Sequence, residues 1–132
     1  MSLIIAVAML LLMALWPSVL LSQSCPPASA FPGRPYFDFQ VDEPARYTGR
    51  DSAHIRPMAQ RVSQPFPPDL ALAQFVVDSI GAPVPGTLKM LVLPTELSKD
   101  DVMLALTSWR FEPALLSKCR VPQLVQTPLR WK

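Results

Sequence analysis

The sequence predicts an α+β domain: a small three-stranded antiparallel or mixed sheet with one main helix packed on it, in the order strand, strand, helix, strand. Three observations predict this fold. Leu70–Val77 is an apolar run between turn-forming residues, which is typical of a buried strand. A helical apolar pattern follows Ser98, and Val121–Trp131 ends the chain as a further strand. The 132 residues are enough for one such domain and a leader.

The leader is residues 1–24, interpreted as a signal peptide or a membrane anchor. Leu3–Trp16 is an unbroken apolar run of 14 residues, within the roughly 7–15 of a signal-peptide core. Val19–Leu21 extends the run beyond Pro17 toward the roughly 20 residues that span a membrane. The leader therefore predicts a periplasmic protein exported by its N-terminal signal, with an inner-membrane anchor as the alternative.

The sequence leaves more than one alternative for the position at which the leader is cleaved. Ala28–Ala30 follows the small-x-small rule, so cleavage as late as residue 30 would release a chain that starts at Phe31. Ser22–Cys25 resembles a lipoprotein cleavage site, which makes Cys25 a candidate for lipidation, although Ser22 stands where such sites carry Leu. Residues 25–35 are Pro-rich and are interpreted as a linker, and residues 36–132 as the folded domain.

The domain begins with a less regular part. Tyr36–Val41 alternates enough to predict an extra N-terminal strand at the edge of the sheet. Asp42–Gln64 is polar and is expected to be irregular. It contains the only histidine, His54, which has no second metal-ligating side chain near it at metal-site spacing. No metal or other cofactor is expected.

A β-hairpin follows. Leu70–Val77 is expected to lie in the centre of the sheet, buried on both faces. Asp78–Gly81 predicts the turn, because Asp caps backbone amides and Gly accepts a positive φ. Thr87–Leu93 is the second strand, and Pro83 and Pro85 are expected to delay its start, because proline cannot donate to the ladder.

Ser98 predicts the start of the helix, as an N-cap with Asp101 at the third helical position. The helix is expected to run to about Trp109. Its buried face consists of residues at i, i+3, i+4 and i+7: Val102, Ala105, Leu106 and Trp109. A helix between the second and third strands allows those two to be parallel, with the first strand between them.

Ser117–Arg120 is expected to be a polar loop before the last strand, Val121–Trp131. Pro122 and Pro128 lie in this strand. Because an inner strand cannot spare two donors, they predict that it forms the edge of the sheet.

Composition and spacing argue against other classes of function. The net charge is +2 and Lys and Arg are scattered, so nucleic-acid binding is not expected. No nucleophile has an adjacent base, and Asp100 and Asp101 are neighbours that fit helix capping, so an enzyme is not expected. A thiol-dependent enzyme is the least favoured hypothesis. Cys119 lies between Lys118 and Arg120 and is interpreted as a plain loop cysteine. The alternative is that it forms a disulfide with Cys25.

Three segments resemble the C-terminal domain of TonB-family proteins. Phe75–Gly81 resembles the first hairpin of that family, and Trp109–Ala114 its helix-end Trp-Arg-aromatic-x-Pro-small signature. Val121–Trp131 resembles its last strand, and Gln64–Pro67 is a weaker match before the first strand. The resemblance covers the chain from about residue 64 to residue 131.

The resemblance implies a protein-binding domain that takes a peptide segment of an outer-membrane or periplasmic protein as an added strand. The expected partner-binding residues are Gln64, Pro65, Leu124, Val125, Gln126 and Thr127. The expected structural core is Phe75, Val77, Leu106, Trp109 and Phe111. An exposed strand edge also makes a homodimer an alternative.

Two hypotheses fit the resemblance: an anchored transducer in energy-coupled outer-membrane transport, and a motor-independent periplasmic or lipid-anchored interaction module. The family's anchors carry Ser and His on one helix face, whereas this leader has Ser18 and no His, which argues against coupling to an inner-membrane motor. Residues 22–65 reach about 150 Å even when fully extended at ~3.4 Å per residue.

Overall fold

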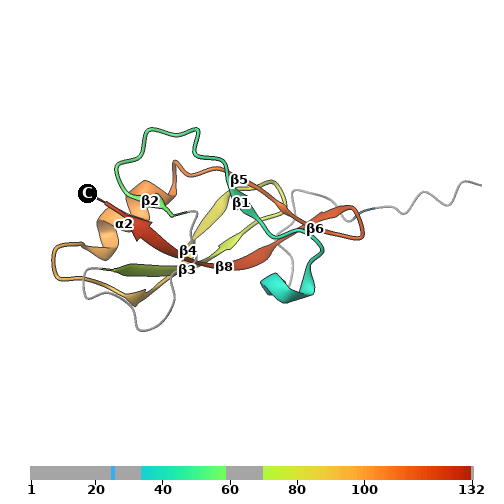
Figure 1. Cartoon of the computed structure of the whole chain (residues 1–132), viewed down its shortest axis with the longest axis horizontal. Coiled ribbons are helices and arrows are strands. Elements are labelled where there is room, and N and C mark those ends of the chain that lie inside the picture. The colour runs from blue at the N-terminus through green and yellow to red at the C-terminus, as the bar shows by residue number, and fades with distance from the viewer. Residues whose placement is uncertain (1–24, 26–33, 59–69, 132) are drawn as a thin grey trace, which may run out of the picture.

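A four-stranded sheet with the strand order β2-β8-β3-β4 forms the centre of the molecule, and helix α2 packs against it (Figure 1). The structure is a computed structural model that describes Cys25, residues 34–58 and residues 70–131. The predicted α+β class is confirmed, but the described residues form more than three strands. The strands of the central sheet are Arg56–Pro57 (β2), Ala71–Val77 (β3), Pro83–Val92 (β4) and Gln123–Arg130 (β8).

The predicted hairpin is present. Strand β3 lies between β4 and β8 and is antiparallel to both, so β4 and β8 run parallel to each other as predicted. Asp78 holds the turn, because its Oδ1 accepts hydrogen bonds from the backbone N–H of Ile80 (3.0 Å) and of Ala82 (2.9 Å). Gly81 has a φ of 89°, which favours glycine. The turn is therefore determined by residues within five positions of one another.

Strand β4 starts at Pro83, earlier than predicted. The Thr87 hydroxyl bridges the two strands: it accepts from the Val76 N–H (2.8 Å) and donates to the Val84 carbonyl (2.6 Å). The backbone N–H and C=O groups of Val84 therefore point toward β3. Because alternate residues of a strand direct their backbone groups to opposite sides, the nitrogens of Pro83 and Pro85 point away from β3. Neither proline removes a ladder bond, so neither delays the strand.

Helix α2 spans Lys99–Leu106, and the Ser98 side chain caps it by accepting from the Asp101 N–H (3.1 Å), as predicted. The helix ends before Trp109, where the prediction placed its end. The hydroxyls of Thr107 and Ser108 donate to the carbonyls three residues before them (2.6 and 2.7 Å). These side-chain bonds compete with continued helix, which explains the earlier end.

The five predicted core residues are all buried: Phe75, Val77, Leu106 and Trp109 at 0% exposure, and Phe111 at 7%. The Trp109 ring packs against Phe75 with 5.6 Å between centroids. Its Nε1–H donates to the Ile55 carbonyl (2.9 Å), so the indole is satisfied inside the core. Ile55 is itself buried, although it lies in the segment predicted to be irregular.

The predicted N-terminal strand is wrong in most of its length. Asp38–Gln40 is a 3-10 helix (η2), and Tyr36 alone forms a bridge, parallel to Gln123. The following segment is more regular than predicted, because it contains β2 and also β1 (Arg46–Tyr47), which pairs with β5 (Phe111–Glu112). Polar strands paired with distant residues leave no apolar pattern for the sequence to show.

The predicted polar loop at residues 117–120 is a hairpin between β6 (Ala114–Leu116) and β7 (Cys119–Val121). Its two turn residues, Ser117 and Lys118, have positive φ values of 50° and 65°. Both central residues of a type I′ hairpin turn have positive φ, a position usually held by Gly, Asn or Asp. The absence of those residues explains why the sequence did not indicate this turn.

Candidate partner-binding surfaces

The last strand, on which the binding site was predicted, is not the edge of the sheet. On the side of β8 away from β3, Tyr36 accepts from the Leu124 N–H (2.8 Å) and donates to the Pro122 carbonyl (3.0 Å). Further along, the Met58 N–H donates to the Pro128 carbonyl (2.8 Å), next to the short strand β2. The prediction that Val121–Trp131 forms the edge is therefore wrong.

The two prolines of this strand have a different explanation. Because Leu124 directs its N–H away from β3, residues two and four positions away direct their nitrogens to the same outer side. Pro122 and Pro128 are such residues, so they cost β8 no bond to β3. Their carbonyls on that side still accept from Tyr36 and Met58. The prolines thus show only that two N–H donors are missing on the outer side of β8; they do not show that this side lacks a neighbouring segment.

Two of the four predicted binding residues of β8 are buried; the four are Leu124, Val125, Gln126 and Thr127. Val125 and Thr127 face the core and are 9% and 7% exposed, and Leu124 is half-buried. Gln126 is exposed, and its Nε2 donates to Oε1 of Gln74 on β3 (2.9 Å). The other two predicted binding residues, Gln64 and Pro65, lie outside the described residues. Of the six, the structure thus shows one exposed side chain.

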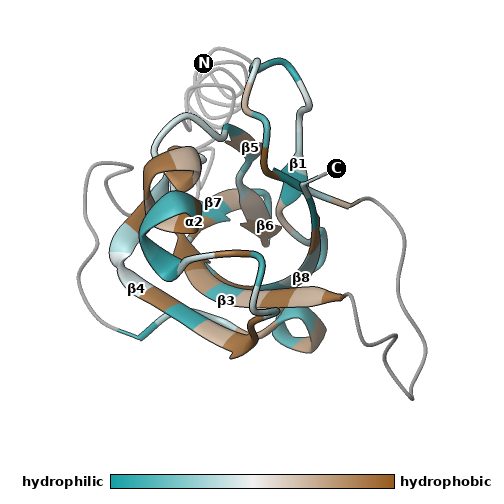
Figure 2. Cartoon of the chain, turned by 90° about the vertical axis from the view of Figure 1, so that its left-hand side faces the viewer, coloured by the Kyte–Doolittle hydropathy of each residue, from teal (hydrophilic) through white to brown (hydrophobic). Residues whose placement is uncertain are grey.

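The opposite edge of the sheet is β4. It pairs with β3 on one side, and the described ranges, 34–58 and 70–131, place no strand on its other side. Both apolar and polar residues occur along it at the margin of the molecule (Figure 2). Leu91 and, just beyond the strand, Leu93 are 38% and 44% exposed. An outer strand of this kind presents backbone N–H and C=O groups in a row, which is a template for another strand.

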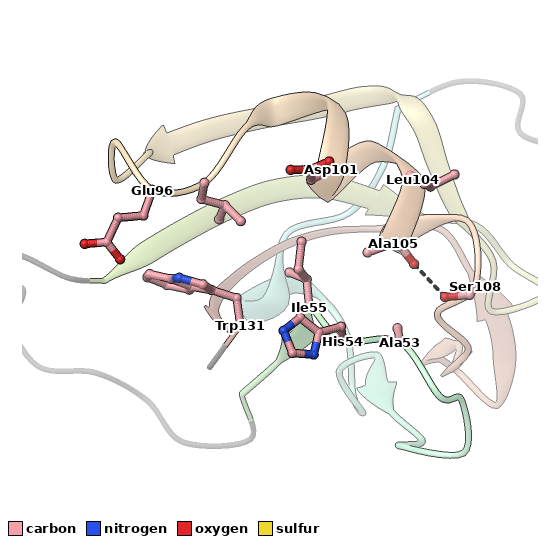
Figure 3. Close-up of a pocket in the computed structure, with 10 residues that line it drawn as sticks. Ala53, His54, Ile55, Glu96, Asp101, Leu104, Ala105, Ser108 and Trp131 are labelled. Carbon is pink, nitrogen blue, oxygen red and sulfur yellow. Dashed lines mark hydrogen bonds between the residues drawn. The ribbon is translucent and has the colours of Figure 1, made fainter.

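A groove with a volume of about 560 Å³ lies between α2, the segment 53–55 and Trp131 (Figure 3). Its size is in the range of small-ligand or side-chain pockets, about 300–1,000 Å³. Ile55 and Leu97 provide apolar lining, and Glu96 and Asp101 add carboxylates. This combination suits an apolar side chain or the stem of a Lys or Arg side chain, whose head would meet the carboxylates.

His54 also lines the groove. No group of three side chains able to hold a metal ion occurs within the described part of the chain. Asp101 lies with Asp100 in the first turn of α2, where carboxylates stabilise a helix N-terminus. The groove therefore combines apolar lining with carboxylates.

Tyr47 lies in β1 and packs against the core. Burial first, and then its hydrogen bond to Asp51, raise the pKa of Tyr47 well above its ordinary value. The phenol therefore remains a protonated donor near neutral pH. Its ring packs against Phe111 with 5.5 Å between centroids. Tyr47 thus acts as a structural link between the N-terminal segment and the core.

Both cysteines of the chain lie in one disulfide, between Cys25 and Cys119, with 5.4 Å between the Cα atoms. The interpretation of Cys119 as a plain loop cysteine is wrong, and the alternative of pairing with Cys25 is what the structure contains. The Cys25 sulfur that lipidation would require is used by this bond. A thiol-dependent reaction at Cys119 would first require the disulfide to open.

Comparison with known protein families, curated proteins and solved structures finds no match to this chain. None of the helices in the described part of the chain has the length and apolar character that crossing a membrane requires. The surfaces described above are therefore the basis for a functional proposal.

Proposed function

We propose that this chain is a protein-binding module of the bacterial envelope, which takes a partner peptide as an added strand along the outer side of β4. The single observation that carries the proposal is the position of β4, at the end of the sheet order with β3 as its one strand neighbour among the described residues. In β-augmentation, main-chain bonds provide affinity, and pockets for alternate side chains provide selectivity.

Strand β4 is favoured over β8 because outer backbone groups at both ends of β8 are already bonded. Tyr36 and Met58 bond to β8 at its two ends, so a peptide there would have to displace them. Beside β4, the exposed side chains of Leu91 and Leu93 give an added strand apolar contacts. Such contacts select a peptide with apolar residues at alternate positions.

Three features support an envelope location. The leader is interpreted as an export signal or a membrane anchor. The segments Phe75–Gly81 and Trp109–Ala114 resemble the TonB C-terminal domain. The disulfide adds to this, because such bonds form and persist in oxidising compartments such as the bacterial periplasm and are rare in the cytosol.

The disulfide also favours the motor-independent hypothesis over the transducer. It joins residue 25 to the folded domain, so a chain still anchored through Leu21 would have only residues 22–24 as a spacer. Three residues span about 10 Å at ~3.4 Å each. A domain held that close to one membrane cannot reach the other, so an anchored form would bind only a partner in the periplasm or on the same membrane.

The test uses a peptide selected from a random-sequence phage library on the purified domain, and its affinity for two matched variants. Leu91→Lys places a charge on the β4 edge, and Leu104→Lys makes the same change on α2 in the groove, where Leu104 is 74% exposed. Because a lysine at an edge opposes strand pairing, we expect Leu91→Lys to weaken binding at least tenfold and Leu104→Lys to leave it unchanged.

Loss of binding in Leu104→Lys alone would assign the site to the groove and overturn the strand proposal. Circular dichroism of both variants controls for folding. Sedimentation of the unliganded protein separates the homodimer alternative: if a second copy covers β4, Leu91→Lys converts a dimer to a monomer. In that case the edge would be an interface between copies of this chain, and not a peptide site.

A further inference from the structure

We infer that export ends in cleavage of the peptide bond between Ser24 and Cys25, so that the mature protein begins at Cys25. The observation is the disulfide, which makes Cys25 a part of the folded domain. A cysteine bonded to residue 119, 94 positions away, is retained only if processing stops before it. The disulfide therefore discriminates between cleavage sites that the leader alone leaves open.

The hairpin that carries Cys119 already binds the N-terminal segment. Leu115 on β6 donates to the Glu43 carbonyl (2.9 Å), and its own carbonyl accepts from Asp42 (2.8 Å). The Ser117 N–H, two residues before Cys119, donates to Asp42 Oδ2 (2.8 Å). The disulfide joins the chain to this same hairpin a second time. The bond therefore extends an established contact between the two segments.

Cleavage after Ala30 would remove Cys25 and leave Cys119 as a single thiol. Lipidation would place a thioether on the same Cys25 sulfur that bonds to Cys119. Ser22-Gln23-Ser24, by contrast, is a small-x-small site directly before Cys25, after the apolar run. Of the cleavage sites in the sequence, this one removes the whole apolar leader and preserves the disulfide.

Maturation of the chain takes two chemical steps. Water adds across the Ser24–Cys25 amide, which leaves a carboxylate on Ser24 and an α-ammonium on Cys25. The Cys25 and Cys119 thiols then give two electrons and two protons to a disulfide-bearing oxidant of the envelope, which leaves as a dithiol. The product is a protein without a membrane anchor, whose first residue is covalently bound to β7.

The experiment is the intact mass of the full-length chain after expression in a bacterium, measured in soluble periplasmic and membrane fractions. We expect a soluble chain that begins at Cys25 and is two hydrogen atoms lighter than its reduced form. Ser24→Leu puts a bulky residue next to the cleaved bond and should accumulate uncut chain, whereas Ala30→Leu should be processed normally.

A mature chain that starts at Phe31, a lipid-bearing Cys25, or an uncut chain of about 14.6 kDa in the membrane would each overturn the inference. Cys119→Ser provides a control for the bond, because its mature chain should start at Cys25 and lack the loss of two hydrogens. Mass depends on neither folding nor peptide binding, so failure here is distinct from failure of strand addition.

Discussion

The two halves of the domain are held in different ways. Residues 70–106 form a hairpin and a helix whose turn and cap are made within a few residues, and whose apolar side chains are buried against one another. Residues 34–58 are held mainly by bonds to distant parts of the chain. The Ala45 N–H donates to Gln123 Oε1, 78 positions away, and the Ile55 carbonyl accepts from Trp109, 54 positions away.

This difference implies a difference in stability between the halves. Residues 70–106 have many buried apolar contacts, which contribute about 25 cal/mol per Å² removed from water. Residues 34–58 contribute fewer side chains to the core, with Ile55 as their buried member. They depend more on single hydrogen bonds, each of about 0.5–1.5 kcal/mol net, and on one disulfide. The N-terminal segment should therefore open locally before the hairpin and helix do. The following changes test this comparison, from the largest expected effect to the smallest.

Gly81→Ala should have the largest effect, because Gly81 lies against β5, the strand that pairs with β1 of the N-terminal segment. A Cβ at Gly81 would lie 2.0 Å from the Phe111 carbonyl oxygen, and the φ of 89° adds strain. We expect a loss of about 4–5 kcal/mol in the free energy of unfolding, measured by urea denaturation. Gly86→Ala is the matched control, because nothing lies within 4 Å of its Cβ position. Equal stability of the two variants would contradict the turn geometry.

Cys119→Ser should destabilise the protein by about 2–4 kcal/mol, because the bond constrains an unfolded chain across 94 positions. Because residues 34–58 are expected to be the less stable region, the loss of stability should appear there first. Amide hydrogen exchange should accelerate at Tyr36 and in β1 well before it does in β3. Acceleration of β3 to the same extent would mean that the two halves unfold together.

Trp109→Phe should have the smallest effect, because it keeps an aromatic ring in the core and removes the bond to the Ile55 carbonyl. We expect a loss of about 1–3 kcal/mol, the cost of leaving a buried acceptor unpaired. Exchange should accelerate at Ile55 and Arg56 in particular. A variant as stable as the parent would show that the Ile55 carbonyl finds another donor.

The same contrast explains what the sequence could predict. The Asp78–Gly81 turn, the Ser98 cap and the buried residues Phe75 and Trp109 were predicted correctly, because each depends on neighbours in the chain or on apolar character. The position of β8 was not, because Tyr36 and Met58 reach its outer side from far away in sequence. Two prolines indicate missing donors, and they cannot indicate whether the carbonyls beside them are used.

For the candidate site, the sequence predicts strand addition at Val121–Trp131, but the structure places that strand inside the sheet and β4 at its edge. Nothing in Thr87–Leu93 distinguishes an outer strand from an inner one, because it contains apolar residues on both faces. The groove beside α2 was also missed. It combines residues from three separate segments, 53–55, 96–108 and 131, none of which carries a motif.

The most direct test of strand addition is amide hydrogen exchange along β4, measured by NMR with and without the selected peptide. Strand addition predicts that protection increases between Leu88 and Val92 at the amides whose N–H groups do not bond to β3. The register shift at Leu91 interrupts strict alternation there. Strand addition also predicts no change at Leu104 or Ala105 on α2. Protection that increases around the groove while β4 remains unchanged would contradict the proposal.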